Sequence, residues 1–239
     1  MTQSRIALVT GANKGIGFEI ARKLAAAGVH VVIGSRDRAR GDAAVAALAE
    51  AGLAADCLHL DLDSAESIAA AAAALQTRFG RLDILVNNAG IFDFSDAAPG
   101  KASVDAVRRV MEVNFIGTLA VTQAMLPLLR AAPGASIVNL SSSMGSLTEN
   151  ADPEAPYYSQ RYIGYNASKA ALNMLTIQLH EELKDQGIRV NSVSPGFVKT
   201  DLTGYGEMTP EEGARLPAEV ALGAGASGRF VEPNGTTPW

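Results

Sequence analysis

Cysteine and histidine are scarce in this chain of 239 residues, and each shortage argues against a class of protein. The one cysteine, Cys57, cannot form a disulfide within the chain, so a reducing cytoplasm is the expected compartment. It lies in a strand-like run, ADCLHL, where a buried and inert thiol is favoured over a catalytic one. The three histidines (His30, His59 and His180) lack the spacing of metal ligands, so no metal site is expected.

The sequence has no basic excess, and neither a membrane-spanning segment nor a leader segment is expected from it. Its longest apolar stretches are too short, or too rich in alanine, to span a bilayer. A net charge of −5 gives no reason to expect nucleic acid or an anionic membrane as a partner. The first residues, MTQSRIALVTG, enter a strand-like run at once and leave no room for a signal peptide. We therefore expect a protein that binds neither nucleic acid nor a membrane.

Apolar residues make up 48% of the chain and charged residues 19%, which is enough for a large core and unlike a disordered chain. No linker rich in proline, glycine or serine divides the sequence, and no internal repeat is visible. Single α/β domains often exceed about 200 residues, so one domain over residues 1–239 is expected.

Strand-like and helix-like segments alternate along the chain. Ile16, Ile20 and Leu24 repeat at helical spacing before Gly28, and Asp63 with Glu66 resembles a capping box that opens a helix reaching about Phe79. Apolar runs predict strands at Arg5–Thr10, His30–Ser35, Ala54–Leu60, Ile84–Val86, Ser136–Leu140 and Arg189–Val193. This alternation predicts an α/β fold: a doubly wound (Rossmann) parallel sheet with helices on both faces.

The junction after the first predicted strand reads TGANKGIG, with glycines at 11, 15 and 17. Glycine allows the chain to turn sharply, lets backbone amides approach a pyrophosphate, and lets the helix pack against the strand. The helix that begins near Ile16 directs its N-terminal amides at such phosphates. Because the motif lies between a strand and an amphipathic helix, it predicts a dinucleotide site and not merely a tight turn.

The end of the second strand predicts which nicotinamide cofactor is bound. An NAD-binding fold carries an acidic residue there, whereas this chain has Gly34-Ser35-Arg36, with no carboxylate until Asp37. Arg36 is suited to a 2′-phosphate, and Lys14 adds a second positive charge. NADPH is therefore predicted over NADH.

Two further strand ends carry candidate cofactor contacts. Asp61, with Leu62 beside it, follows the third strand and is either an acceptor for the adenine amino group or a helix N-terminal residue. Asn87-Asn88-Ala89-Gly90 follows the fourth strand. Its small residues allow the backbone to lie beside the adenine ribose, while the asparagine side chains tie adjacent strands together.

Tyr165 and Lys169 lie four residues apart in the segment YNASK, a spacing that puts both side chains on one helix face. Three serines, residues 141–143, follow the fifth predicted strand and face the ligand crevice of a parallel sheet. Tyrosine, with a pKa of about 10, is a poor acid or base at neutral pH. An adjacent ammonium and a positive nicotinamide lower that pKa. The set predicts hydride transfer between nicotinamide and a small carbonyl or alcohol substrate, with a serine holding the substrate oxygen.

The order TGANKGIG, NNAG, Asn114, SSS, YNASK and Pro195-Gly196 resembles the short-chain dehydrogenase/reductase family along nearly the whole chain. The resemblance implies that Tyr165 is the acid–base and that Lys169 binds the ribose and modulates the tyrosine pKa. It implies that Ser142 binds the substrate oxygen and that Asn114 holds a water in the proton relay. SPGFVKTDL resembles the family's segment over the nicotinamide, with Val198 and Thr200 against the carboxamide and phosphates. The expected NADPH/NADP+ contacts are Gly11, Asn13, Lys14, Gly15, Ile16, Gly17, Arg36, Asp61, Leu62, Asn88, Ala89, Gly90, Tyr165, Lys169, Pro195, Gly196, Val198 and Thr200.

Within the family, NKGIG, GSRDRARG and EEGA resemble the carbonyl reductases, which implies NADPH-dependent reduction of ketones, aldehydes or quinones. Ser142 and Tyr165 are further apart than in many members, which predicts a substrate loop near 147–161 and a lid near 197–213. Oligomeric state stays open between monomer, homodimer and homotetramer, and Trp239 packs either on a neighbouring subunit or on its own domain. Two other functions stay open: an oxidative alcohol or sterol dehydrogenase, and a cofactor-sensing protein, which is expected to lose Tyr165 or Lys169. A serine hydrolase is excluded because GxSxG is absent.

Overall fold

One mixed sheet runs through the molecule, which we describe from a computed structural model over residues 4–202 and 204–239. Its strand order is β3-β2-β1-β4-β5-β6-β7-β8; β8 is antiparallel to β7, and all other neighbours are parallel. The strands are β1 (Ile6–Thr10), β2 (His30–Ser35), β3 (Ala55–His59), β4 (Ile84–Asn87), β5 (Ser136–Leu140), β6 (Arg189–Val193), β7 (Phe230–Glu232) and β8 (Gly235–Thr236). The predicted doubly wound α/β fold is therefore confirmed.

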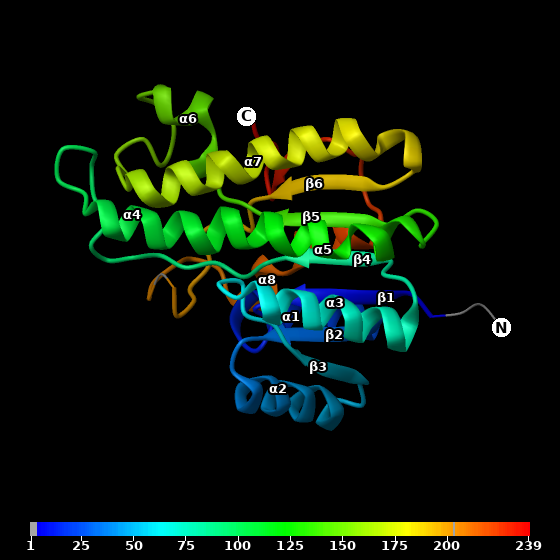
Figure 1. The fold of residues 1–239 in the computed structure, drawn as a ribbon. Coiled ribbons are helices and arrows are strands. Elements are labelled where there is room, and N and C mark those ends of the chain that lie inside the picture. The colour runs from blue at the N-terminus through cyan, green and yellow to red at the C-terminus, as the bar shows by residue number, and fades with distance from the viewer. Residues whose placement is uncertain (1–3, 203) are drawn as a thin grey trace.

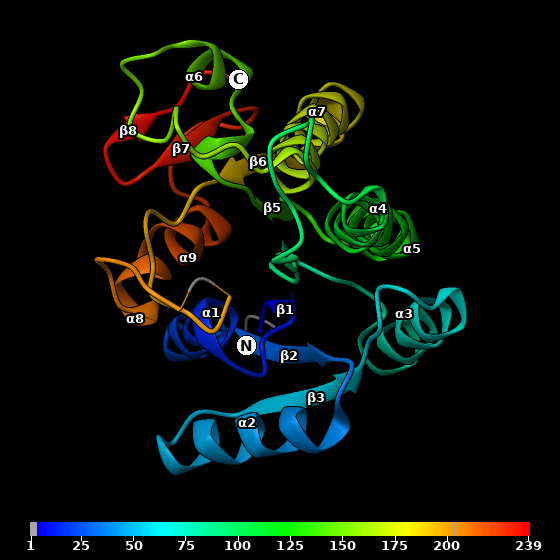
Figure 2. The same ribbon diagram turned by 90° about the vertical axis from the view of Figure 1, so that its left-hand side faces the viewer.

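Helices cover both faces of the sheet (Figures 1 and 2). The helices are α1 (Gly15–Ala26), α2 (Arg38–Glu50), α3 (Ala65–Phe79), α4 (Val104–Met111), α5 (Thr118–Arg130), α6 (Leu147–Ala151), α7 (Ile163–Leu183), α8 (Pro210–Gly213) and α9 (Arg215–Leu222). Figure 2 shows α3, α5 and α7 on one side of the sheet and α1 and α9 on the other. Short turns of other helix types lie at Glu112–Gly117 (π), Ser143–Gly145 (3₁₀) and Lys184–Gln186 (3₁₀).

The alternation of side chains along β1 produces two separate cores. Leu8 faces the core formed with α3, α5 and α7, while Val9 faces the core formed with α1, α2 and α9. Both side chains are fully buried, and burial of one such side chain stabilises the fold by roughly 1.5–3 kcal/mol. Because a core packs on each face of the sheet, the strands that carry the loops at its carboxyl-terminal edge are held in place from both sides.

The six predicted strands match β1 to β6 to within one residue at each end, whereas one helix cap and two short strands differ from the prediction. The predicted cap Asp63 is wrong: Ser64 is the N-cap of α3, and its hydroxyl accepts a hydrogen bond from the Ser67 amide. Either residue type can cap a helix, and only the backbone geometry selects between them. β7 and β8 were not predicted, because strands of three and two residues carry too little pattern.

The helical stretch Val104–Arg130 corrects the expectation that the longest apolar stretches are too short, or too rich in alanine, to span a bilayer. It has 27 residues and is long and apolar enough by composition to do so. However, half of its most apolar 18-residue window is buried inside the protein. Val121 and Met125 of α5 are fully buried in one core, as expected for a helix that covers a sheet.

The C-terminal residue, Trp239, packs on its own chain. Its ring stacks on that of Phe230 in β7, with the ring centroids 5.7 Å apart. Its carbonyl oxygen accepts hydrogen bonds from the amide and hydroxyl of Thr148 at 3.2 and 2.9 Å. The tail therefore contacts its own domain and holds the start of the 147–161 segment.

Candidate active site

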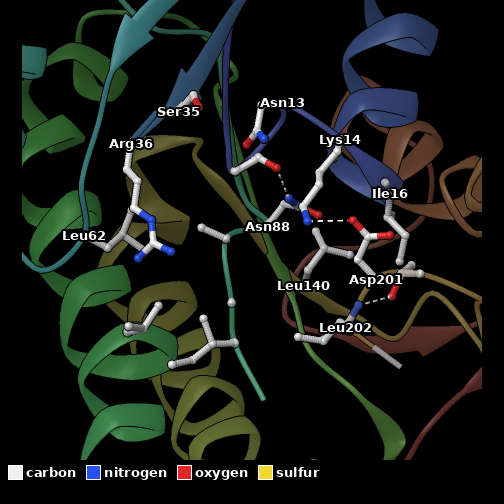
Figure 3. A pocket seen from close by; sticks show the side chains of 18 of the residues that line it. Asn13, Lys14, Ile16, Ser35, Arg36, Leu62, Asn88, Leu140, Asp201 and Leu202 are labelled. Atoms are coloured by element: carbon white, nitrogen blue, oxygen red, sulfur yellow. Dashed lines mark hydrogen bonds and ion pairs between the residues drawn. The ribbon is translucent and has the colours of Figure 1, made fainter. Parts of the chain in front are cut away.

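A cleft of about 830 Å³ lies at the carboxyl-terminal edge of the sheet (Figure 3). Most residues expected to bind the cofactor line it: Gly11, Asn13, Lys14, Gly15, Ile16, Gly17, Arg36, Asp61, Leu62, Asn88, Ala89, Gly90, Tyr165, Lys169, Pro195 and Thr200. Gly196 and Val198 are not among its lining residues. Val198 is buried, and its side chain packs closely on Gly213. A Cβ added to Gly213 would lie 2.4 Å from a methyl carbon of Val198.

The glycine turn has the geometry of an anion site. Gly15 has a φ of +60°, and a Cβ built on Gly17 would lie 2.3 Å from the side-chain nitrogen of Asn88, so neither position tolerates a larger residue without strain. Lys14, the N-cap of α1, forms no capping hydrogen bond with its side chain, and the first turn carries no acidic residue. The first amides of α1 therefore stay available to a phosphate, as the helix dipole favours.

Asn88 and Asn87 tie strands together, as predicted. The Asn88 side chain donates to the carbonyls of Thr10 and Gly11 at 2.8 and 3.2 Å, joining β4 to β1. The Asn87 side chain donates to Asn139 of β5 at 2.8 Å. These bonds hold three neighbouring strand ends in register beneath the cleft.

The Arg36 and Lys14 side chains both line the cleft but point away from each other (Figure 3). Arg36 extends into the cleft from the end of β2. The Lys14 ammonium instead pairs with the Asp201 carboxylate at 2.7 Å. Asp61 lines the cleft, and its carboxylate accepts from the Asp63 amide at 3.2 Å, ahead of the α3 N-cap Ser64. Its contact with the adenine amino group stays a prediction.

Tyr165, Lys169 and Ser142 come together because α7 packs tightly on the turn after β5. A Cβ on Gly145 would be 2.7 Å from the Lys169 carbonyl carbon, so only glycine permits this approach. The Lys169 ammonium lies 5.6 Å from the centre of the Tyr165 ring and donates to the carbonyl of Leu140 at 2.8 Å. The Ser142 hydroxyl hydrogen-bonds with Tyr165.

The predicted lowering of the tyrosine pKa does not hold for the protein itself. Burial raises the pKa of Tyr165 to about 12, and the hydrogen bond with Ser142 lowers it by less than burial raises it. Burial also lowers the pKa of Lys169 to about 8, because desolvation disfavours its charged form. At neutral pH the site therefore holds a protonated phenol beside an ammonium.

Asn114 lies beside the cleft in the π-helical turn between α4 and α5, where its side chain bridges two segments. Its oxygen accepts from the Ile91 amide at 2.8 Å, and its nitrogen donates to the Ile91 carbonyl at 3.0 Å and to the Ser168 hydroxyl at 3.1 Å. Ser168 in turn donates to the carbonyl of Tyr165 at 2.7 Å. Asn114 therefore connects the segment after β4 with the helix that carries the tyrosine.

The family model for short chain dehydrogenases matches residues 5–209. The chain belongs to the short-chain dehydrogenase/reductase family. Carbonyl reductase [NADPH] 1 of Mus musculus is 33% identical over 282 residues, which cover 100% of both chains. (+)-Neomenthol dehydrogenase of Arabidopsis thaliana is 35% identical over 272 residues and 91% of each chain. The NADPH-bound carbonyl reductase from chicken fatty liver superposes with a TM-score of 0.86 at 30% identity, covering 99% of this chain and 100% of that one.

Several residues of this dehydrogenase/reductase cleft escaped the sequence analysis. Asp201, Leu202 and Gly204 line it from the expected lid, while Ile91 and Val113 line it from the segment after β4 and from the π-turn. Asp201 could have been noticed as a carboxylate in SPGFVKTDL, close to the predicted Thr200. Ile91 and Val113 carry no chemical signal, since only packing brings them to the cleft.

Proposed function

We propose that the protein is an NADPH-dependent carbonyl reductase that transfers a hydride to a ketone, aldehyde or quinone. The observation that carries this proposal is that Tyr165 and Lys169 line the same cleft as the glycine turn and Arg36, with the Ser142 hydroxyl hydrogen-bonded to Tyr165. Membership of the family and the relatives named carbonyl reductase support it.

The cleft residues fit NADP(H). The uncapped first turn of α1 would bind the pyrophosphate, and the Arg36 guanidinium would bind the 2′-phosphate with charge-assisted hydrogen bonds. Lys14 would add a second cation once it leaves Asp201. Lys169 lines the same cleft and would hold ribose hydroxyls. When bound, the cofactor supplies the hydride and, once oxidised, a positive charge beside the phenol.

The side chains divide the remaining work between binding and proton transfer. The Ser142 hydroxyl donates to the substrate carbonyl oxygen, which orients it and stabilises its developing negative charge. The Tyr165 hydroxyl then gives its proton to that oxygen, as a general acid. The Lys169 ammonium, 5.6 Å from the ring, stabilises the phenolate that remains. Asn114 holds Ile91 and Ser168 in place around Tyr165. As the family resemblance implies, it also belongs to the relay that returns a proton to the Tyr165 phenolate.

The raised pKa of Tyr165 bears on the direction of the reaction. With a pKa of about 12, the phenol carries its proton at neutral pH, which is the form that carbonyl reduction requires. Alcohol oxidation requires the phenolate, and the positive charge of the oxidised cofactor would lower the Tyr165 pKa toward that form. In an oxidative dehydrogenase the rate should therefore grow as the pH rises.

The test measures the consumption of NADPH with a panel of ketones, aldehydes and quinones. The readout is the loss of absorbance of the reduced nicotinamide. We expect turnover of several members of the panel and a lower KM for NADPH than for NADH. Tight NADPH binding with no carbonyl reduced would instead identify a cofactor-sensing protein. Equal KM values for the two cofactors would overturn the assignment of NADPH.

A further inference from the structure

The helix that carries Tyr165 and Lys169 begins without a cap of its own. The N-cap of α7, Tyr162, makes no side-chain capping hydrogen bond, and the first turn has no acidic residue. Its free amides must therefore find acceptors elsewhere, since unpaired amides at a buried helix end are costly.

Asp96, from the loop after β4, supplies those acceptors. One carboxylate oxygen accepts from the Gly164 amide at 3.0 Å, and the other accepts from the Tyr165 amide at 2.8 Å. The carbonyl of the next residue, Ala97, accepts from the Ile163 amide at 3.0 Å. Asp96 thus binds the backbone of the tyrosine itself, 69 residues further along the chain.

The carboxylate is buried and well placed for this task. Asp96 is 5% exposed, and its first oxygen also accepts from the Ala97 amide at 2.9 Å. A negative charge at a helix N-terminus is favoured by the helix dipole, and charge-assisted hydrogen bonds are about twice as strong as neutral ones. Asp96 therefore holds the first turn of α7 more firmly than a neutral cap.

The same loop reaches the cofactor cleft. Ala89, Gly90 and Ile91 line the cleft, and Ile91 is held on both its amide and carbonyl by Asn114. One segment, 89–96, therefore contacts the cofactor cleft at its start and the Tyr165 backbone at its end. Segment 89–96 therefore links the cofactor cleft to the Tyr165 backbone and determines where the phenol lies relative to the cofactor.

We propose that Asp96 is a positioning residue for the reaction, which holds the Tyr165 backbone so that the phenol stays at the Ser142 hydroxyl. The inference rests on the proposed reductase function. Displacement of a catalytic group by about 1 Å can reduce a rate about 100-fold, so a small loosening of this turn suffices to be measured.

Asp96→Asn is the informative change because it keeps the size of the side chain. The amide has one acceptor oxygen, so its NH₂ group must face the N–H of either Gly164 or Tyr165. Asp93→Asn is the matched control, because Asp93 belongs to the same loop. Among the described residues, its carboxylate accepts from the Ser95 amide and from Arg109 and forms no hydrogen bond with α7. Both variants lose one carboxylate.

The experiment compares kcat and KM for a carbonyl that the unmodified protein reduces, the Kd for NADPH, and the NMR resonance of Tyr165 in protein with ring-labelled tyrosine. The resonance is assigned by its loss in Tyr165→Phe. For Asp96→Asn we expect kcat to fall about 10- to 100-fold, with the NADPH Kd within about twofold of the original value and a shifted Tyr165 resonance. Asp93→Asn should leave all three within about twofold.

A lower melting temperature for Asp96→Asn with kcat and the Tyr165 resonance unchanged would overturn the inference, since Asp96 would then serve stability alone. If that variant does not fold, Asp96→Glu keeps the charge but moves it by one methylene, and the same readouts apply. The resonance does not depend on turnover. If the unmodified protein reduces no carbonyl, the reductase proposal fails, while the resonance still decides whether Asp96 positions Tyr165.

Discussion

The Lys14 ammonium lies 2.7 Å from the Asp201 carboxylate, so the glycine turn is joined to a segment 187 residues later in the chain. Both residues line the cleft, and their side chains are 54% and 77% exposed. The hydrogen bond from Lys14 lowers the pKa of Asp201. In the proposed reductase, Asp201 therefore competes with the cofactor 2′-phosphate for Lys14.

Asp201→Asn should strengthen NADPH binding. Exposed ion pairs contribute roughly 0–1 kcal/mol, so release of Lys14 should lower the Kd for NADPH by no more than about fivefold and leave that for NADH unchanged. Titration calorimetry at two salt concentrations measures both values, and the gain should shrink at high salt. Weaker NADPH binding by this variant would mean that the ion pair holds the segment over the cofactor instead of competing with it.

Arg36→Asp should convert cofactor preference. Loss of a charge-assisted contact costs roughly 1.5–3 kcal/mol, so we expect the KM for NADPH to rise about 10- to 100-fold, with a much smaller change for NADH. Arg38→Asp is the matched control, because Arg38 lies two residues later and does not line the cleft. An equal rise in the KM for NADPH and for NADH in Arg36→Asp would show that Arg36 does not bind the 2′-phosphate.

Tyr165→Phe should remove nearly all turnover while leaving NADPH binding close to intact. General acid catalysis contributes about 10²- to 10⁴-fold, and phenylalanine keeps the ring packing against Phe92 while losing the proton. Steady-state kinetics and the NADPH Kd test both parts. A Tyr165→Phe protein that kept most of its activity would contradict the mechanism.

Carbonyl reduction should decline as the pH rises through about 8. The lowered pKa of Lys169 means that its ammonium loses its proton there, while Tyr165, with a pKa of about 12, still carries its own. The loss of positive charge therefore raises the cost of forming the phenolate. Lys169→Arg keeps a charge throughout this range, so the decline near pH 8 should be absent from its kcat profile, whatever its absolute rate. The same decline in that variant would assign it to another group.

Gly145→Ala should separate the serine turn from α7. The added Cβ would be 2.7 Å from both the carbonyl carbon and the Cβ of Lys169, and overpacking of this kind costs roughly 1–3 kcal/mol of unfolding free energy. We expect a lower melting temperature and a lower kcat, since Ser142 moves with the turn. Gly100→Ala is the control, because its Cβ would meet no atom within 4 Å. An unchanged kcat in Gly145→Ala would show that the turn tolerates displacement.

Regular local patterns made most of the fold predictable. The strand at His30–Ser35 and the helix ending at Phe79 follow from periodic apolar residues, which report burial directly. The short strands β7 and β8 did not follow, because pairing with β6, and not their own pattern, makes them strands. The choice of Ser64 over Asp63 as the N-cap of α3 was likewise not predictable from the sequence, because it depends on the backbone geometry.

By itself, the sequence determined the alternation of strands and helices, the glycine turn and the Tyr165–Lys169 pair, because each depends on residues a few positions apart. Only the tertiary structure decided the pairing of Lys14 with Asp201, the support of the tyrosine backbone by Asp96, and the raised pKa of Tyr165. Those three features depend on distances between segments far apart in the chain and on exclusion of water, and neither quantity is written in a local pattern.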